Sequence, residues 1–201
     1  LKDGRVIKGV VARTSSVVEN PNKPGGQAGE IATRPILVVD DELRRIFISA
    51  QRVNNIIEQA PEQLVTIKPW QHPAEGAARL IAVGPAINIT PFDEYGRRVY
   101  EMQSADGPIS VVQGITELTP RYTKLSSLHG PQRALAWEAS MATSSLPPDV
   151  IAKVMAKAIQ QDDWQARIQA VRWYQQAGRF PDARRELERI IEEFPDQKGL
   201  Q

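Results

Sequence analysis

The spacing of apolar residues differs between the two parts of this chain. Up to about residue 125 they form short runs separated by turn residues, which is the pattern of antiparallel strands. After about residue 145 they recur at the spacing of helices that bury one face. The two spacing patterns predict an α+β fold, with a β-rich domain over residues 1–125 and a helical region over residues 129–201.

The β-rich part is expected to form antiparallel sheets, arranged as a small barrel or a sandwich. It is either one domain or two subdomains that meet near residues 60–75. Gly114 lies inside the last apolar run and indicates a bulge or a bend, whereas the Gly- and Pro-rich stretch 19–33 is typical of a surface loop. The runs that predict strands are residues 5–12, 35–39, 44–48, 64–70, 80–89, 97–103 and 109–118.

Start and stop residues predict three helices in the last third of the chain. Proline and aspartate at 147–149 suit a first turn, because proline lacks only an N–H that has no partner there and aspartate meets the positive end of the helix dipole. Gly178 suits the left-handed residue that ends a second helix. A third helix is expected to begin at residues 180–182 and to end before Pro195.

Two finer assignments concern the neighbouring segments. Asp162 and Gln165 have the spacing of a capping box, which would begin the second helix at Asp162. Residues 129–143 are expected to hold a further helix, with Leu135 and Trp137 as apolar anchors.

Composition argues against several kinds of chemistry. The chain has no cysteine, so disulfides, thiolate metal sites and cysteine nucleophiles are excluded. Its two histidines, His72 and His129, are few for a histidine-built metal site. No nucleophile elbow or phosphate-binding glycine motif is present, and the acidic run 40–42 is predicted to be a solvated turn. We therefore expect no enzymatic activity, no catalytic residues, no cofactor and no metal.

Charge and hydropathy bear on partners. The 25 basic and 24 acidic residues give a net charge of +1 without a basic arm, so nucleic-acid binding is not favoured. No stretch approaches the ~18 apolar residues of a membrane-spanning helix. The absence of cysteine fits a reducing or an oxidising compartment equally, which leaves localisation open.

The segment 164–197 resembles a tetratricopeptide repeat. Tyr174, Gly178, Ala183 and Pro195 stand at matching positions of a 34-residue unit, whereas Arg167, Ala170 and Val171 depart from the pattern. The resemblance implies a helical hairpin that packs on neighbouring helices and binds a protein with its first helix. The residues that this implies as a protein-binding face are Gln165, Ile168, Arg172, Gln175 and Gln176. Trp173 is assigned either to the core or to a partner contact.

The N-terminus resembles the first motif of Sm-like, SH3-like small barrels. The residues that carry the resemblance are Leu1-Lys2-Asp3-Gly4-Arg5 followed by Gly9 and Val10. It implies a later strand pair within 46–56, and in that family such a barrel binds RNA. Asn54 and Asn55 replace the Arg-Gly of the second motif.

These observations favour a non-enzymatic protein-interaction or structural scaffold module. Its partner would be another protein, or a second copy bound through the C-terminal helices. The chain starts at Leu1 inside a strand pattern and ends directly after a helical one, so we expect it to be part of a longer protein or assembly. The alternatives are an accessory region of a larger enzyme and, third, RNA binding through an Sm-like barrel.

Overall fold

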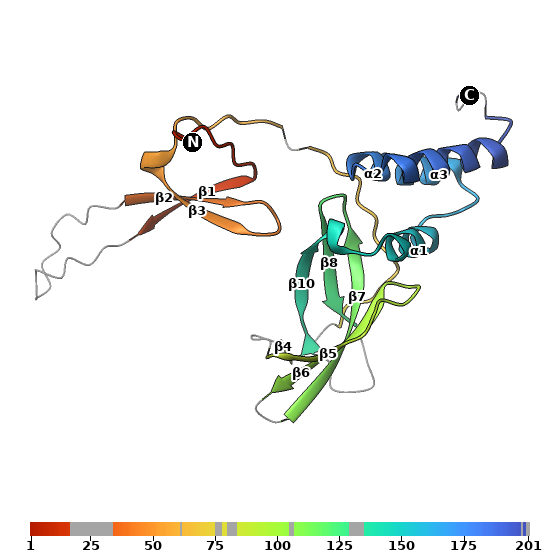
Figure 1. Cartoon of the computed structure of the whole chain (residues 1–201), viewed down its shortest axis with the longest axis horizontal. Helices are drawn as coiled ribbons and strands as arrows, with labels where there is room; N and C mark the ends of the chain where they lie inside the picture. Colours follow the sequence, from red (N-terminus) through yellow and green to blue (C-terminus); the bar gives the residue numbers. More distant parts are fainter. Residues whose placement is uncertain are drawn as a thin grey trace, which may run out of the picture. The chain divides into compact units, whose positions relative to one another are not determined.

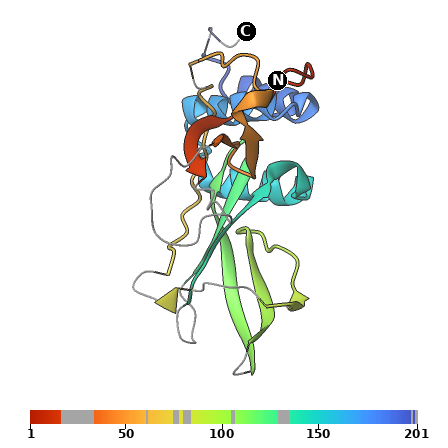
Figure 2. The same ribbon diagram turned by 90° about the vertical axis from the view of Figure 1, so that its left-hand side faces the viewer.

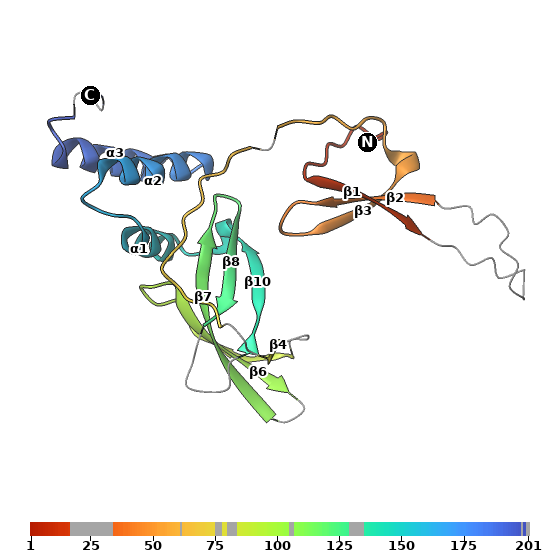
Figure 3. The ribbon, with the colours of Figure 1, turned by 180° about the vertical axis from the view of Figure 1, so that it is seen from behind.

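The chain folds into two compact units, Leu1–Pro61 and Glu62–Gln201. A computed structural model (Figures 1 and 3) describes residues 1–16, 34–60, 62–74, 78–79, 84–104, 107–128, 135–197 and 199. The predicted loop at 19–33 and His129 therefore lie outside the described residues. Strands fill the first part of the chain and helices close it, so the predicted α+β class is confirmed.

The first unit contains a three-stranded antiparallel sheet. The expected strands at 35–39 and 44–48 are confirmed, and they pair as a hairpin with Leu37 opposite Ile48. Leu37, Val39 and Ile48 are buried. The elements are β1 (Val10–Ser16), β2 (Arg34–Asp40), β3 (Arg45–Ser49) and the short 3-10 helix η1 (Ala50–Arg52), so the first strand begins later than predicted.

The acidic run between β2 and β3 forms a turn in which the charges are paired. Asp41 accepts a hydrogen bond from Arg44 Nε at 2.8 Å, and Asp40 accepts one from Arg45 Nε at 2.8 Å. These hydrogen bonds lower the pKa of both carboxyl groups. The ion pairs are largely exposed, as expected for a solvated turn.

The resemblance to an Sm-like barrel is not supported. In place of a strand pair, residues 46–56 form the end of β3, the 3-10 helix η1 and an extended segment. The two glycines of the motif are nevertheless turn positions, with φ of 83° at Gly4 and 153° at Gly9. A Cβ on Gly9 would lie 2.5 Å from the Asp40 carbonyl oxygen, so glycine lets the chain approach the end of β2.

The second unit is built on a five-stranded antiparallel sheet of order β10-β8-β7-β6-β5, which curls into a half-barrel (Figure 2). Its strands are β5 (Ala86–Ile89), β6 (Arg97–Ser104), β7 (Gly107–Leu118), β8 (Tyr122–Ser127) and β10 (Glu138–Ala142). A short parallel pair is formed by β4 (Ala78–Arg79) and β9 (Leu135–Ala136). Residues 80–83 of the predicted strand at 80–89 lie outside the described residues.

Three helices gather at one end of this sheet, and α1 lies nearest to the strands (Figures 1 and 2). They are α1 (Pro148–Ala158), α2 (Trp164–Gln176) and α3 (Phe180–Glu193). Ile115 and Leu125 of the sheet share one hydrophobic core with Val154 of α1 and Ile190 of α3. Gly178 has a φ of 69° and follows α2, so its predicted role at the helix end is confirmed.

The resemblance to a tetratricopeptide repeat is contradicted by the structure. The C-terminal region has three helices in all, and among the described residues the α2–α3 pair is not followed by a second one. Arg167, one of the departures from the pattern, is buried in the pair and bonds Glu186 at 2.8 Å and Glu193. A buried charge held by two carboxylates takes the place of an apolar repeat contact.

Three finer predictions were wrong. Residues 135–136 and 138–142 are strands rather than a helix, because the first pair with β4 and the second with the edge of β8. Residues 64–70 are extended but contribute only the isolated bridge between Ile67 and Leu118. Asp163 rather than Asp162 caps α2, since its carboxylate accepts a hydrogen bond from Gln165 N at 2.8 Å.

Candidate functional site

An extended segment, residues 62–74, crosses the face of the sheet that points away from the helices, and we call it the strap. At one end Ile67 pairs with Leu118 of β7, and at the other Ala74 N donates to the Ser127 carbonyl at 2.8 Å. Between these points Gln71 passes over Gly114, where an added Cβ would lie 3.2 Å from Gln71 Cδ. Glycine at 114 therefore makes room for the crossing.

Gln71 fastens the strap to the hairpin before β6. Its side-chain Nε2 donates to the Tyr95 carbonyl at 2.7 Å, and its Oε1 accepts from Arg97 Nε at 3.0 Å. Arg97 lies opposite Gly114 in the β6–β7 ladder, so both contacts are made at the crossing point. The strap is thus held at both ends and in the middle.

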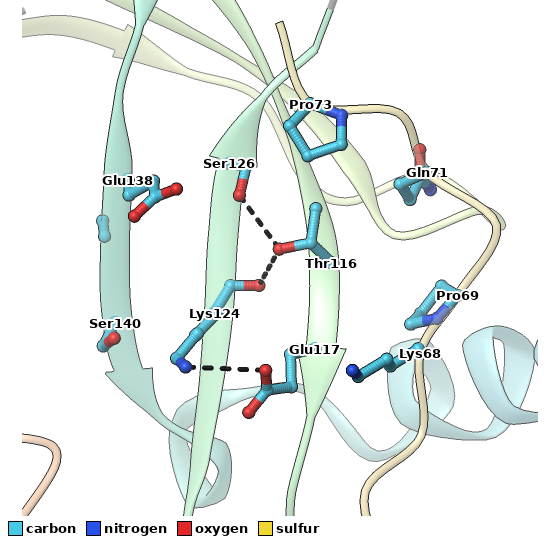
Figure 4. Close-up of a pocket in the computed structure, with 11 residues that line it drawn as sticks. Lys68, Pro69, Gln71, Pro73, Thr116, Glu117, Lys124, Ser126, Glu138 and Ser140 are labelled. Atoms are coloured by element: carbon cyan, nitrogen blue, oxygen red, sulfur yellow. Dashed lines mark hydrogen bonds and ion pairs between the residues drawn. The ribbon is translucent and has the colours of Figure 1, made fainter. Parts of the chain in front are cut away.

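The strap and the strands β7, β8 and β10 enclose a groove of about 630 Å³ (Figure 4). Polar side chains from four segments line it, because alternate residues of β8 and β10 point to this face. Its charged and hydroxyl-bearing side chains are Lys68, Thr116, Glu117, Lys124, Ser126, Glu138 and Ser140.

Charges within the groove are partly paired. Lys124 Nζ lies 3.5 Å from Glu117 Oε2, and the hydroxyls of Thr116 and Ser126 are 3.0 Å apart. Lys68 and Glu138 are both exposed and have no ion-pair partner among the described residues. The groove therefore presents one unpaired positive charge on the strap and one unpaired negative charge on β10.

The serines that line the groove are Ser126 and Ser140. Among the residues that line it there is no histidine that could act as a general base for a serine. The Ser126 hydroxyl is hydrogen-bonded to Thr116 instead. His72 belongs to the strap but does not line the groove, and within the described residues no group of acidic or histidine side chains could hold a metal ion.

One rim of the groove is a free edge of the sheet. Among the described residues, strand β10 is the last strand in the order and pairs with β8 alone. Ser127 N donates to the Trp137 carbonyl at 2.8 Å, which sets the alternation so that Ala139 and Met141 bond to β8. The backbone N–H and C=O groups of Glu138 and Ser140 therefore point away from the sheet.

The opposite edge of the sheet is protected. The pairing of β5 with β6 shifts its register between Ala86 and Asn88, and Pro85 precedes the strand. Bulges and prolines are devices that block strand addition at an edge. Strand β10 has neither, so the two edges differ in their ability to accept another strand.

The site residues predicted on α2 differ in their exposure and in their hydrogen bonding. Gln165, Arg172 and Gln175 are exposed, and Ile168 is half-buried against the core. Gln176 is exposed, but its amide group is occupied by the strap: Oε1 accepts from Val65 N at 2.8 Å and Nε2 donates to the Gln63 carbonyl at 3.0 Å.

Trp173 is removed from the set of possible partner contacts. It is completely buried, and its indole N–H donates to the Leu118 carbonyl at 3.1 Å. Of its two predicted assignments, the structure supports the core. The sequence did not predict the groove, since its only signals for it are Gly114 and the prolines Pro69 and Pro73 some forty residues before it.

Comparison of the chain with protein-family models, with curated proteins and with solved structures finds no significant match. Among the described residues, no helix has the length and apolar character needed to cross a membrane.

Proposed function

We propose that this chain is a non-enzymatic protein-interaction module that binds an extended segment of a partner protein along the free edge of β10. The observation that carries the proposal is the outward-facing backbone of Glu138 and Ser140, on the rim of the polar groove. A segment added as a further strand gains main-chain hydrogen bonds from these groups, and every second side chain reaches the groove face.

The charges of the groove define the chemistry of the partner. Glu138 lies on β10 itself and favours a basic side chain on the segment, because it has no ion-pair partner among the described residues. The hydroxyls and the Lys124–Glu117 pair favour small polar side chains between them. A polar segment with a basic side chain is the occupant that fits.

The exposed face of α2 is the competing surface for a protein partner or for a second copy of the chain. Its exposed members, Gln165, Arg172 and Gln175, are polar side chains on a helix whose backbone groups are already bonded to one another. Strand addition at β10 offers backbone hydrogen bonds in addition to side-chain contacts, so the edge is the better supported surface.

The test is a pair of substitutions at one position of β10. Ser140→Pro removes the outward N–H, and proline is tolerated at a sheet edge whose N–H faces solvent. Ser140→Ala keeps that N–H and is the matched control. Peptides about ten residues long are selected from a random display library on the wild-type chain, and their affinities are then measured for each variant.

We expect Ser140→Pro to weaken binding by about tenfold or more and Ser140→Ala to leave it nearly unchanged. Glu138→Pro removes the other outward N–H and should act in the same way. It replaces Ser140→Pro if circular dichroism shows that the first variant does not fold. Binding that survives both prolines but is lost in Arg172→Glu would move the site to α2 and overturn the proposal. Dimerisation without peptide binding would also overturn it.

A further inference from the structure

The face of the sheet opposite the groove carries an unsatisfied buried amide. Gln113 of β7 is completely buried, and its Oε1 accepts a hydrogen bond from Arg98 Nε at 2.9 Å. Its Nε2 has no hydrogen-bond partner, the one such case among the buried side-chain polar atoms of the described residues. Buried donors without a partner are rare and destabilising, so an acceptor is expected beside this group.

Apart from Nε, which donates to Gln113, the guanidinium nitrogens of Arg98 have no acceptor among the described residues. Arg98 lies directly opposite Gln113 in the β6–β7 ladder and is half-buried. It forms no ion pair with any acidic side chain of the described residues, and its guanidinium lies 4.7 Å from the centre of the Phe92 ring. Burial lowers the pKa of Arg98, as expected for a cation removed from water without a counter-ion.

Aromatic side chains lie near these donors. Tyr100 follows Arg98 on the same face of β6, and its ring centre lies 5.0 Å from that of Trp137 in an edge-to-face contact. The ring of Phe92 lies against the guanidinium of Arg98. A positive charge against an aromatic ring, next to an amide donor, suits a ligand that brings a negative charge on a flat group.

We propose that Arg98 and Gln113 bind the carboxylate group of a ligand. One guanidinium charge is neutralised by one carboxylate charge, and the flat two-oxygen group matches the donors of arginine. The Nε2 of Gln113 supplies the second donor and gains the acceptor that it lacks. This site is independent of the edge of β10, because it lies on the other face of the sheet.

The carboxylate has two possible sources, a small aromatic acid or the C-terminus of a peptide. The probes are benzoate for the first, and N-acetyl-alanyl-alanine compared with its C-terminal amide for the second. Sodium chloride at the same ionic strength controls for screening. The readouts are the melting temperature Tm and the NMR resonances of the Arg98 Nε–H and Gln113 side-chain amide groups in the full chain.

We expect a carboxylate probe to raise Tm by about 3 °C at ten times its Kd and to shift both resonances. The amide-capped peptide and chloride should do neither. Arg98→Gln should abolish the response, whereas Arg172→Gln, which changes an exposed arginine of α2, should retain it. Gln113→Glu supplies a carboxylate from the chain itself, so it should raise Tm without any probe and abolish the response to benzoate.

The proposal is overturned if neither resonance moves with any probe, since a buried water would then be the partner of Gln113. It is also overturned if Arg98→Gln responds as the wild type does. Should Arg98→Gln fail to fold, Gln113→Glu decides: a lower Tm together with an unchanged response to benzoate contradicts the site. Peptide binding at β10 is measured separately with Ser140→Pro, so failure of one proposal leaves the other standing.

Discussion

Gly114 is the residue that allows the strap to cross the sheet. An added Cβ would lie 2.7 Å from Leu128 Cδ1 and 3.2 Å from Gln71 Cδ, so both side chains would have to move. We expect Gly114→Ala to destabilise the fold by about 1–3 kcal/mol through overpacking. It should also speed hydrogen exchange of the Ala74 amide, which is bonded to Ser127 at the end of the strap.

Gly178→Ala is the matched control for that prediction. Its φ of 69° strains a side chain, but nothing lies within 4 Å of an added Cβ. Gly178→Ala should therefore lower the free energy of unfolding by about 1 kcal/mol. It should not speed hydrogen exchange of the Ala74 amide beyond what this overall loss of stability explains. If hydrogen exchange of the Ala74 amide speeds up equally in both variants, Gly114 has no special part in placing the strap.

Single residues could be interpreted from the sequence where their role is local. The left-handed turn at Gly178 depends only on its neighbours along the chain, and it was predicted. The burial of Arg167 was not, because its partners Glu186 and Glu193 lie on another helix. The unsatisfied amide of Gln113 could not be predicted either, since it depends on which residue the next strand places beside it.

Trp173 joins three elements of the second unit, and its removal should weaken all of them together. The Leu118 carbonyl at the end of β7 accepts from Trp173 Nε1 of α2 and also from Ile67 N of the strap. We expect Trp173→Phe to lower the free energy of unfolding by about 1–3 kcal/mol, through the lost hydrogen bond and the space left by the smaller ring. Urea unfolding followed by circular dichroism measures it.

Trp164→Phe is the companion variant, because Trp164 is only half-buried at the start of the same helix. Its cost should stay below about 1 kcal/mol. A cost equal to that of Trp173→Phe would contradict the role assigned to the Leu118 junction.

Elements were predicted well where the periodic pattern is long. The helices α1, α2 and α3 and the strands β6 and β7 follow from apolar spacing and stop residues. The prediction of a helix over β10 was wrong, because the sequence of this strand, Glu-Ala-Ser-Met-Ala, has weak preference for a strand. Its state is decided by the edge of β8, so the rim of the groove could not be found from the sequence.

At the scale of the whole molecule, each unit has a separate apolar core. The large cluster that contains Trp173 draws only on residues 62–201, whereas the first unit buries Leu37, Val39 and Ile48 among its described residues. Sequence periodicity separated a strand-rich part from a helical one, but the second unit contains both. Which strands share a core with the helices is a long-range property that local patterns do not carry.

Separate cores predict separate unfolding transitions in the intact chain. All four tryptophans lie after residue 61, so tryptophan fluorescence reports on the second unit alone, while far-ultraviolet circular dichroism reports on both. With its few buried side chains, the first unit should unfold at lower urea concentration than the second.

Val39→Ala, which shortens a buried side chain of β2, should move the first dichroism transition to lower urea and leave the fluorescence transition in place. Trp173→Phe should do the reverse. If Val39→Ala shifts both transitions together, the two units unfold as one and the division at Pro61 has no energetic meaning.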